Sequence, residues 1–234
     1  MIRFDRASKR YLNGREALTA ASFEIGDGEM VFLTGRSGAG KSTILKLISL
    51  LERPTRGLVM VNGHNTAALS SRRIPAFRRE LGVVFQDHRL LTERSIFDNI
   101  ALPLHAAETG ISLKEIDRRV RAALDQVGLL DRARSLPLEL SVGEQQRVGI
   151  ARAVVGKPKL LIADEPTGNL DPGLSLEVMG IFKRFNEVGV TVVVATHDLD
   201  IVRAWNLREI QVDGGRVQDA RTEEFRLPII EAER

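Results

Sequence analysis

The stretch Gly35-Arg36-Ser37-Gly38-Ala39-Gly40-Lys41-Ser42 matches the pattern G-x-x-x-x-G-K-S and is followed by Thr43. It lies between an unbroken apolar run, residues 30–33, and a helical pattern that extends to about Glu52. A glycine-rich loop between a strand and a helix lets backbone N–H groups surround phosphate oxygens at the helix N-terminus. The stretch therefore predicts a nucleotide-binding loop over residues 35–43, in which Lys41 contacts the β- and γ-phosphates and Ser42 ligates Mg²⁺.

Two further apolar runs, residues 160–163 and 191–195, have the length and composition of buried strands. Helical stretches separate the apolar runs, which is typical of parallel β-α-β units. Hairpin signals at Asn13-Gly14 and at Asp213-Gly214 or Gly214-Gly215 predict antiparallel strands near both ends. The predicted fold class is α/β: a P-loop NTPase fold with a mixed β core, in which antiparallel N-terminal strands accompany a parallel central sheet.

The middle of the chain has a helical character. Apolar residues between 112 and 127 recur at steps of three and four, as on one face of a helix. Ser112 and Glu115 have capping-box spacing at its start, and Gly128 is expected to end it. The expected division is residues 1–86 for the first part of the ATP-binding core, 87–156 for an inserted, mainly helical subdomain, 157–220 for the second part of the core and 221–234 for a tail.

The composition limits the classes of protein. Of 234 residues, 34 are Lys or Arg and 31 are Asp or Glu, so the net charge of +3 gives no reason to expect a nucleic-acid partner. The absence of cysteine excludes disulfides, thiol catalysis and thiolate metal sites. No apolar run approaches the ~18 residues of a spanning helix, and the charged start lacks the apolar core of a secretion signal. We therefore expect a cytoplasmic α/β protein.

Residues 160–165 read Leu-Leu-Ile-Ala-Asp-Glu, an apolar strand that ends in two carboxylates. At the C-terminal edge of a parallel strand, beside a phosphate loop, Asp164 is placed to hold Mg²⁺ and its water shell. Glu165 is placed to polarise an attacking water. Acids at a strand end are often only solvated, but the phosphate loop makes the catalytic interpretation the stronger one.

The segment Leu140-Ser141-Val142-Gly143-Glu144-Gln145-Gln146-Arg147 precedes a second helix. In the plain interpretation, Ser141 and Glu144 form a capping box. In the alternative, the helix start presents Ser141 and the Gly143 N–H group to a phosphate. Because the phosphate loop and the two acids already complete one nucleotide site, a second phosphate-facing helix start would serve a neighbouring subunit. The residues leave both interpretations open.

Polar side chains also follow two other apolar runs. Gln86 comes just after residues 83–85, and His197 comes just after residues 191–195. Ligands bind at such strand ends in α/β sheets, although purely structural residues are common there too. Tyr11, the only tyrosine, lies beside the first hairpin and has an ordinary interpretation as a half-buried aromatic.

Together and in this order, these segments resemble the nucleotide-binding subunits of ABC transporters, from Tyr11 to about Gly215. The matching positions are residues 35–42, Gln86, 140–146, 160–165, 168–171 and His197. The resemblance implies a head-to-tail homodimer with two ATP molecules, each held between the phosphate loop of one subunit and the Ser141 segment of the other. It also implies that Tyr11 stacks on adenine, Gln86 senses Mg²⁺ and the attacking water, His197 contacts the γ-phosphate, and Asp171 belongs to the loop that crosses between the two sites.

Within this family, residues 85–91 (Phe-Gln-Asp-His-Arg-Leu-Leu) are most similar to the bacterial cell-division members. That resemblance implies FtsX as the integral membrane partner, and cytoplasmic division proteins such as FtsZ or FtsA as further contacts. It implies a place on the cytoplasmic face of the inner membrane, at the division septum, where ATP turnover activates peptidoglycan hydrolases outside the cell. Lipoprotein-release and macrolide-export subunits share the general motifs and remain alternatives, as does an ATP-binding scaffold with little need for hydrolysis.

One residue departs from the family pattern, because Val142 stands where the family's signature usually has glycine. Glycine permits close approach of a phosphate and a positive φ, and a β-branched residue resists both. We therefore hypothesise a weakened γ-phosphate contact in trans and slow turnover.

Overall fold

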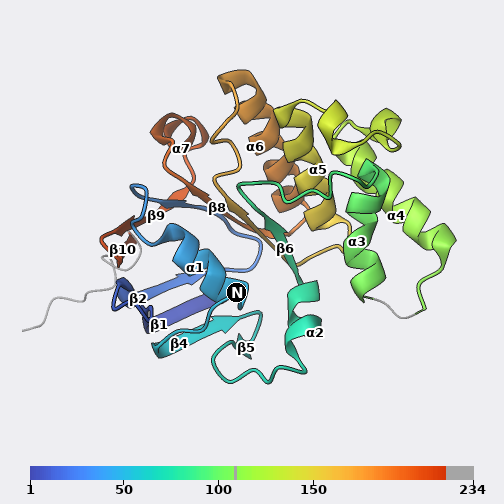
Figure 1. The fold of residues 1–234 in the computed structure, drawn as a ribbon. Helices are drawn as coiled ribbons and strands as arrows, with labels where there is room; N and C mark the ends of the chain where they lie inside the picture. Colours follow the sequence, from blue (N-terminus) through green and yellow to red (C-terminus); the bar gives the residue numbers. More distant parts are fainter. Residues whose placement is uncertain (108–109, 220–234) are drawn as a thin grey trace, which may run out of the picture.

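The computed structural model describes residues 1–107 and 110–219, and its centre is a six-stranded sheet (Figure 1). The strand order is β10-β9-β3-β8-β7-β6, and all neighbours except β10 and β9 pair in parallel. The bounds are β3 (Met30–Thr34), β6 (Leu81–Val84), β7 (Leu160–Asp164), β8 (Thr191–Thr196), β9 (Arg208–Asp213) and β10 (Arg216–Asp219). Every residue of β3 and β8 is buried, as expected of strands covered on both faces. The parallel core predicted from the apolar runs is confirmed.

A second, antiparallel sheet has the order β2-β1-β4-β5. Its strands are β1 (Ile2–Arg10), β2 (Glu16–Ile25), β4 (Arg56–Val61) and β5 (His64–Asn65). The predicted hairpin between β1 and β2 is present, but its turn runs from Tyr11 to Arg15 and is longer than the two-residue turn expected at Asn13-Gly14. The predicted hairpin between β9 and β10 turns tightly at Gly214-Gly215.

α1 (Lys41–Ile48) begins at the phosphate loop and lies between the two sheets (Figure 1). It ends before the expected Glu52. Leu50 takes a left-handed φ of 54°, and the N–H groups of Leu51 and Glu52 both donate to the carbonyl of Lys46. This reversal of the chain ends the helix.

The six-stranded sheet separates two hydrophobic cores. Met30 and Phe32 of β3 point into one core, and Val31 and Leu33 point into the other, as the alternation of a strand requires. The second core is shared with α1 and the antiparallel sheet. The first core is shared with α6 (Pro172–Glu187), α7 (Leu199–Trp205) and the helices of residues 87–156.

Within its described part, the segment 87–156 contains helices and no strand. α2 (Ile74–Arg79) precedes it, and it comprises α3 (Ile96–Ala107), α4 (Leu113–Gln126), the short 3₁₀ turns Leu130–Arg132 and Pro137–Glu139, and α5 (Val142–Val154). Figure 1 shows α3, α4 and α5 together on one side of the molecule, beside β6. Among the described residues, no helix is long and apolar enough to cross a bilayer.

The predicted start and end of α4 are present, with one correction. Ser112 accepts a hydrogen bond from the Glu115 N–H group, and Gly128 ends the helix with a φ of 69°. The Glu115 carboxylate does not return to Ser112 but binds Arg118 and Arg119. Only half of the predicted capping box is formed, because two arginines one turn further along compete for the carboxylate.

Candidate functional site

The phosphate loop occupies the gap between β3 and α1. Gly35 has a φ of 141°, and a Cβ atom there would lie 2.1 Å from the carbonyl oxygen of Val212. Gly40 has a φ of 124°, and a Cβ atom there would lie 2.7 Å from the carbonyl oxygen of Ala17. Both positions therefore require glycine. Gly40 also caps α1 without a side-chain acceptor, so the first N–H groups of α1 are left for a ligand.

A cavity of about 380 Å³ opens beside this loop. It brings together side chains that are far apart in the sequence: Tyr11, Arg15, Ala17, Ser37, Gly38, Gly40, Lys41, Ser42, Thr43, Lys46, Gln86, Glu165 and His197. Most of the residues predicted for nucleotide binding therefore meet here. Gly35, Arg36 and Ala39 build the loop but do not line the cavity.

Lys41 is the buried cation of the site, with a side chain only 6% exposed. Its Nζ atom donates to the carbonyl of Gly35 at 2.6 Å and lies 3.2 Å from Oε1 of Glu165. The ammonium group thus lies across the phosphate loop, where it is held by a carbonyl and a carboxylate. This is the place from which it can reach a phosphate oxygen.

Glu165 is fixed on both of its carboxylate oxygens. Oε1 pairs with Lys41, and Oε2 lies 2.8 Å from Nδ1 of His197 and accepts a hydrogen bond from the His197 N–H group at 3.3 Å. Glu165 takes a left-handed φ of 48°, a strained conformation for a non-glycine residue. Because β7 and β8 are neighbours, the two residues that follow them meet at one edge of the sheet.

Ser42 and Asp164 form the oxygen-rich corner of the site. Ser42 Oγ donates to Asp164 Oδ1 at 3.2 Å, and both residues line a second cavity of about 320 Å³ together with Gln86. Burial raises the pKa of Asp164, and its hydrogen bond from Ser42 opposes that shift. A hydroxyl, one carboxylate and an amide oxygen beside a phosphate site fit Mg²⁺, which takes few protein ligands and completes its shell with phosphates and water.

Ser141, Gly143 and Asp171 do not line either cavity. Ser141 caps α5 and exchanges hydrogen bonds with Glu144, so the capping box is present. Asp171 caps α6 by accepting from the Leu174 N–H group at 3.1 Å. Within one chain, Ser141 and Asp171 therefore have structural roles, and a role of any of the three residues in nucleotide binding requires a second chain.

Val142 is the first residue of α5, and its side chain is 50% exposed. It is not among the described residues with positive φ. The expectation that this position needs a positive φ is therefore wrong, because the first position of a helix has ordinary helical dihedral angles. The remaining ground for the hypothesis is the bulk of the Val142 side chain, which hinders close approach of a phosphate.

Arg15 was missed from the sequence. Its Nη2 atom donates to the carbonyl of Gly38 at 2.9 Å, and its side chain lines the cavity with Tyr11. The sequence did offer a signal for Arg15, because this basic residue lies on the same hairpin turn as Tyr11, which was predicted to bind the nucleotide.

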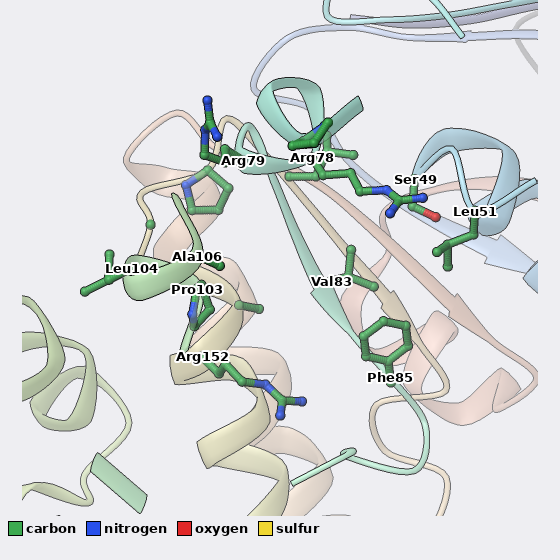
Figure 2. Close-up of a pocket in the computed structure, with 15 residues that line it drawn as sticks. Ser49, Leu51, Arg78, Arg79, Val83, Phe85, Pro103, Leu104, Ala106 and Arg152 are labelled. Atoms are coloured by element: carbon green, nitrogen blue, oxygen red, sulfur yellow. The ribbon is translucent and has the colours of Figure 1, made fainter. Parts of the chain in front are cut away.

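A separate groove of about 680 Å³ lies between the core and the helical segment (Figure 2). Its lining is largely apolar and includes Leu51, Val83 and Phe85 from the core and Pro103, Leu104 and Ala106 from α3. Three arginines, Arg78, Arg79 and Arg152, complete it. The groove adjoins the cavity that contains Ser42 and Asp164, the oxygen-rich corner suited to Mg²⁺ and called the Mg²⁺ corner below. Four residues line both the groove and that cavity: Ser49, Leu51, Val83 and Phe85.

This fold and site define a P-loop ATP-binding subunit that carries a helical segment. Residues 18–168 match the ABC transporter family, and the chain belongs to that family. It is similar to the cell division ATP-binding protein FtsE of Escherichia coli K12, with 54% identity over 217 residues that cover 93% of this chain and 97% of the relative. FtsE of Bacillus subtilis 168 is 45% identical over 215 residues, which cover 92% and 93%.

Solved structures agree with these relatives. The dimeric bacterial ABC transporter cassette MJ0796 matches with a TM-score of 0.86 and 36% identity, covering 93% of this chain and 97% of that chain. The same cassette in a post-hydrolysis state with ADP and Pi gives a TM-score of 0.85 at 35% identity over the same shares. The resemblance to ABC nucleotide-binding subunits of the cell-division kind is confirmed.

Proposed function

We propose that this chain is the ATPase subunit of an ABC complex in bacterial cell division and acts as FtsE does. The observation that carries the ATPase assignment is the contact of Glu165 with both Lys41 and His197 beside the phosphate loop. The identity to FtsE relatives along nearly the whole chain supports the cellular role.

The reaction is attack of water on the γ-phosphate of ATP. Tyr11 stacks on the adenine, the loop N–H groups and Lys41 hold the phosphates, and Arg15 supports the loop at Gly38. Glu165 orients and polarises the water, and His197 holds the Glu165 carboxylate and contacts the γ-phosphate. Ser42, Asp164 and Gln86 would hold Mg²⁺, which supplies charge neutralisation at the phosphates.

The second half of each reaction centre comes from another copy of the chain. The N-terminus of α5 does not line the chain's own cavities, but it carries Ser141 and Gly143 at a helix start, where N–H groups attract anions. A head-to-tail dimer brings this helix start to the γ-phosphate bound by the partner. The similar cassette MJ0796 is dimeric, which supports a dimer of this chain.

The membrane subunit, FtsX or an FtsX-like protein, binds in the groove of Figure 2. The groove combines an apolar floor with arginines, so it suits an apolar cytoplasmic helix with acidic flanks. In this proposal, the core is residues 1–86 and 157–220, and the helical subdomain that carries motion to the membrane is residues 87–156. Residue 220 and the tail, 221–234, lie outside the described residues. FtsZ or FtsA are further partners at the septum.

Glu165→Gln tests the ATPase assignment. We expect it to bind ATP like the wild type, to lower turnover by at least about 100-fold and to accumulate an ATP-bound dimer in size-exclusion chromatography with light scattering. Glu177→Gln is the matched control, because its carboxylate pairs with Arg147 away from the cavity. Turnover by the Glu165 variant at the wild-type rate would contradict the assignment. Full complementation of cell division by that variant would instead favour the scaffold alternative.

Co-expression with candidate membrane subunits tests the cellular role. We expect the chain to co-purify with an FtsX-like protein rather than with a lipoprotein-release or macrolide-export subunit. Ala106→Glu in the groove should abolish this association without changing the ATPase rate of the isolated chain. Leu113→Glu, on an exposed part of α4, is the matched control and should leave the association intact.

A further inference from the structure

One arginine of α5 fastens the turn that follows Gln86. Arg152 donates from Nη1 to the carbonyl of Arg89 at 2.7 Å and from Nη2 to the carbonyl of His88. Figure 2 shows its side chain reaching from α5 toward the segment that follows Phe85. Within residues 1–107 and 110–219, no carboxylate lies within ion-pair distance of Arg152. The two backbone carbonyls are therefore its direct partners.

The turn itself is strained without such a restraint. His88 and Arg89 are adjacent non-glycine residues with φ angles of 53° and 49°, and side chains disfavour this left-handed conformation. Within the turn, Arg89 stacks on the Phe85 ring at 4.2 Å and pairs with Asp87 at 3.1 Å. These exposed contacts do not tie the turn to another element, whereas the charged hydrogen bonds of Arg152 tie it to α5.

The turn lies at a junction of three parts of the molecule. Gln86, Asp87 and Arg89 line the cavity that contains Ser42 and Asp164. Phe85 and Arg152 line the groove on the other side. α5, which anchors Arg152, also carries Ser141 at its opposite end. A displacement of α5, or an occupant of the groove, can therefore act on Gln86 through the guanidinium of Arg152.

We infer that Arg152 is a positioning residue for hydrolysis: its guanidinium holds the turn at residues 87–89 and thereby sets the position of Gln86 relative to the Mg²⁺ corner. The inference rests on the proposed function, because the position of Gln86 affects a rate only if ATP is hydrolysed there. Arg152 lines neither of the two cavities beside the phosphate loop, and it acts on Gln86 through the backbone. It makes the nucleotide site responsive to α5 and to the groove.

The test compares Arg152→Ala with Arg184→Ala. Arg184 of α6 also donates to a backbone carbonyl, that of Gln126 at 3.2 Å, but it lines neither the nucleotide cavities nor the groove, so it is a matched control. For Arg152→Ala we expect amide hydrogen exchange of residues 85–91 to accelerate by about tenfold. We expect kcat to fall by about tenfold with an almost unchanged KM for ATP, and the Mg²⁺ concentration for half-maximal rate to rise several-fold. Arg184→Ala should leave all four quantities unchanged.

Two further variants separate positioning from a merely structural role. Arg152→Lys keeps a cation but lacks the forked guanidinium that binds two carbonyls, so its exchange rate, kcat and Mg²⁺ requirement should lie between those of the wild type and of Arg152→Ala. It also replaces the alanine variant in the test if Arg152→Ala does not fold. In a Gln86→Ala background, Arg152→Ala should add little further loss of kcat, because both changes remove the same function. Equal losses in both backgrounds, or wild-type Mg²⁺ dependence in Arg152→Ala, would overturn the inference. If the wild type itself hydrolyses no ATP, the proposed function fails, while the exchange measurement still tests the fastening of the turn.

Discussion

The starts of α1 and α5 are built in opposite ways, although we propose that both bind phosphate. α1 begins after Gly40, which offers no side-chain acceptor to the helix N–H groups. α5 begins after Ser141, which accepts from the Glu144 N–H group, while Glu144 accepts from both the N–H and the hydroxyl of Ser141. One helix start is open in the free chain, and the other is satisfied by its own residues.

This difference indicates an order of events. An open helix start is ready for an anion, because the missing cap leaves N–H groups that a phosphate can satisfy. A capped start must exchange part of its capping box, worth about 1 kcal/mol, before Ser141 turns to a ligand. ATP should therefore bind first at α1 of one chain, and the α5 start of the other chain should join afterwards. Dimer closure, rather than nucleotide binding, is then the step that the α5 start controls.

The largest effect is expected from a side chain placed at the start of α1, which lacks a cap. Gly40→Ala places a Cβ atom against the Ala17 carbonyl at a φ that alanine disfavours, so we expect ATP affinity to fall by about 100-fold. The same substitution in α5, Gly149→Ala, meets open space inside a helix and should leave affinity unchanged while raising stability by about 0.5–1 kcal/mol. Isothermal titration with ATP measures both. Equal affinities for the two variants would show that α1 does not hold the phosphates.

A smaller effect is expected from removing the cap of α5. Ser141→Ala should cost about 1 kcal/mol of stability, and so should Ser112→Ala, which removes the N-cap of α4. Only Ser141→Ala should also lower steady-state ATPase activity, by about tenfold, because only that hydroxyl faces a partner's phosphate in the proposed dimer. Thermal unfolding and ATPase assays on the pair separate the two roles of a capping serine. Parallel losses of activity in both variants would point to stability alone.

Val142→Gly sharpens the comparison further. Because Val142 has ordinary helical geometry, its effect on turnover is that of bulk at the approach to the α5 start. Removing the side chain should raise the maximal ATPase rate by about threefold to fivefold and lower stability by about 0.5 kcal/mol, the difference in helix propensity. Rates at saturating ATP and at several protein concentrations measure the effect. An unchanged rate would show that the valine is not an obstacle.

The parts predicted from sequence are those with local causes. The apolar run of β3, the glycines of the phosphate loop and the acids after β7 are short patterns whose neighbours in sequence fix their geometry. Gln86 and His197 were found because strand ends gather at one edge of a parallel sheet. The early end of α1 was not predicted, because it depends on the left-handed turn at Leu50.

The missed contacts link residues that are distant in sequence. Arg15 reaches the phosphate loop from another sheet, and Arg152 reaches the Gln86 turn across the boundary with the helical segment. A guanidinium that donates to a backbone carbonyl leaves no pattern of its own, because the acceptor can belong to any residue type. The capping box at Ser112 failed for a related reason: the spacing was right, but Arg118 and Arg119 compete for Glu115.

In the nucleotide-free chain, a modest change in stability is expected from Asp164, the acid beside the start of α1. Burial raises the pKa of Asp164 above its ordinary value of about 4. The folded state therefore binds more protons than the unfolded state between the two pKa values, and stability from this group declines as the pH rises through the folded pKa. Asp164→Asn removes the carboxylate and with it this decline in stability. We expect it to stabilise the nucleotide-free chain by about 0.5–1 kcal/mol at pH 7, with a difference that vanishes below about pH 4, and to lower ATPase activity strongly. Urea unfolding at a series of pH values, without nucleotide, measures this difference in stability, and a variant that is less stable than the wild type at pH 7 would contradict the prediction.

At the capped start of α5, Glu144→Gln should change stability in the opposite direction. The hydrogen bonds from Ser141 lower the pKa of Glu144, so replacing this carboxylate should destabilise the chain at neutral pH.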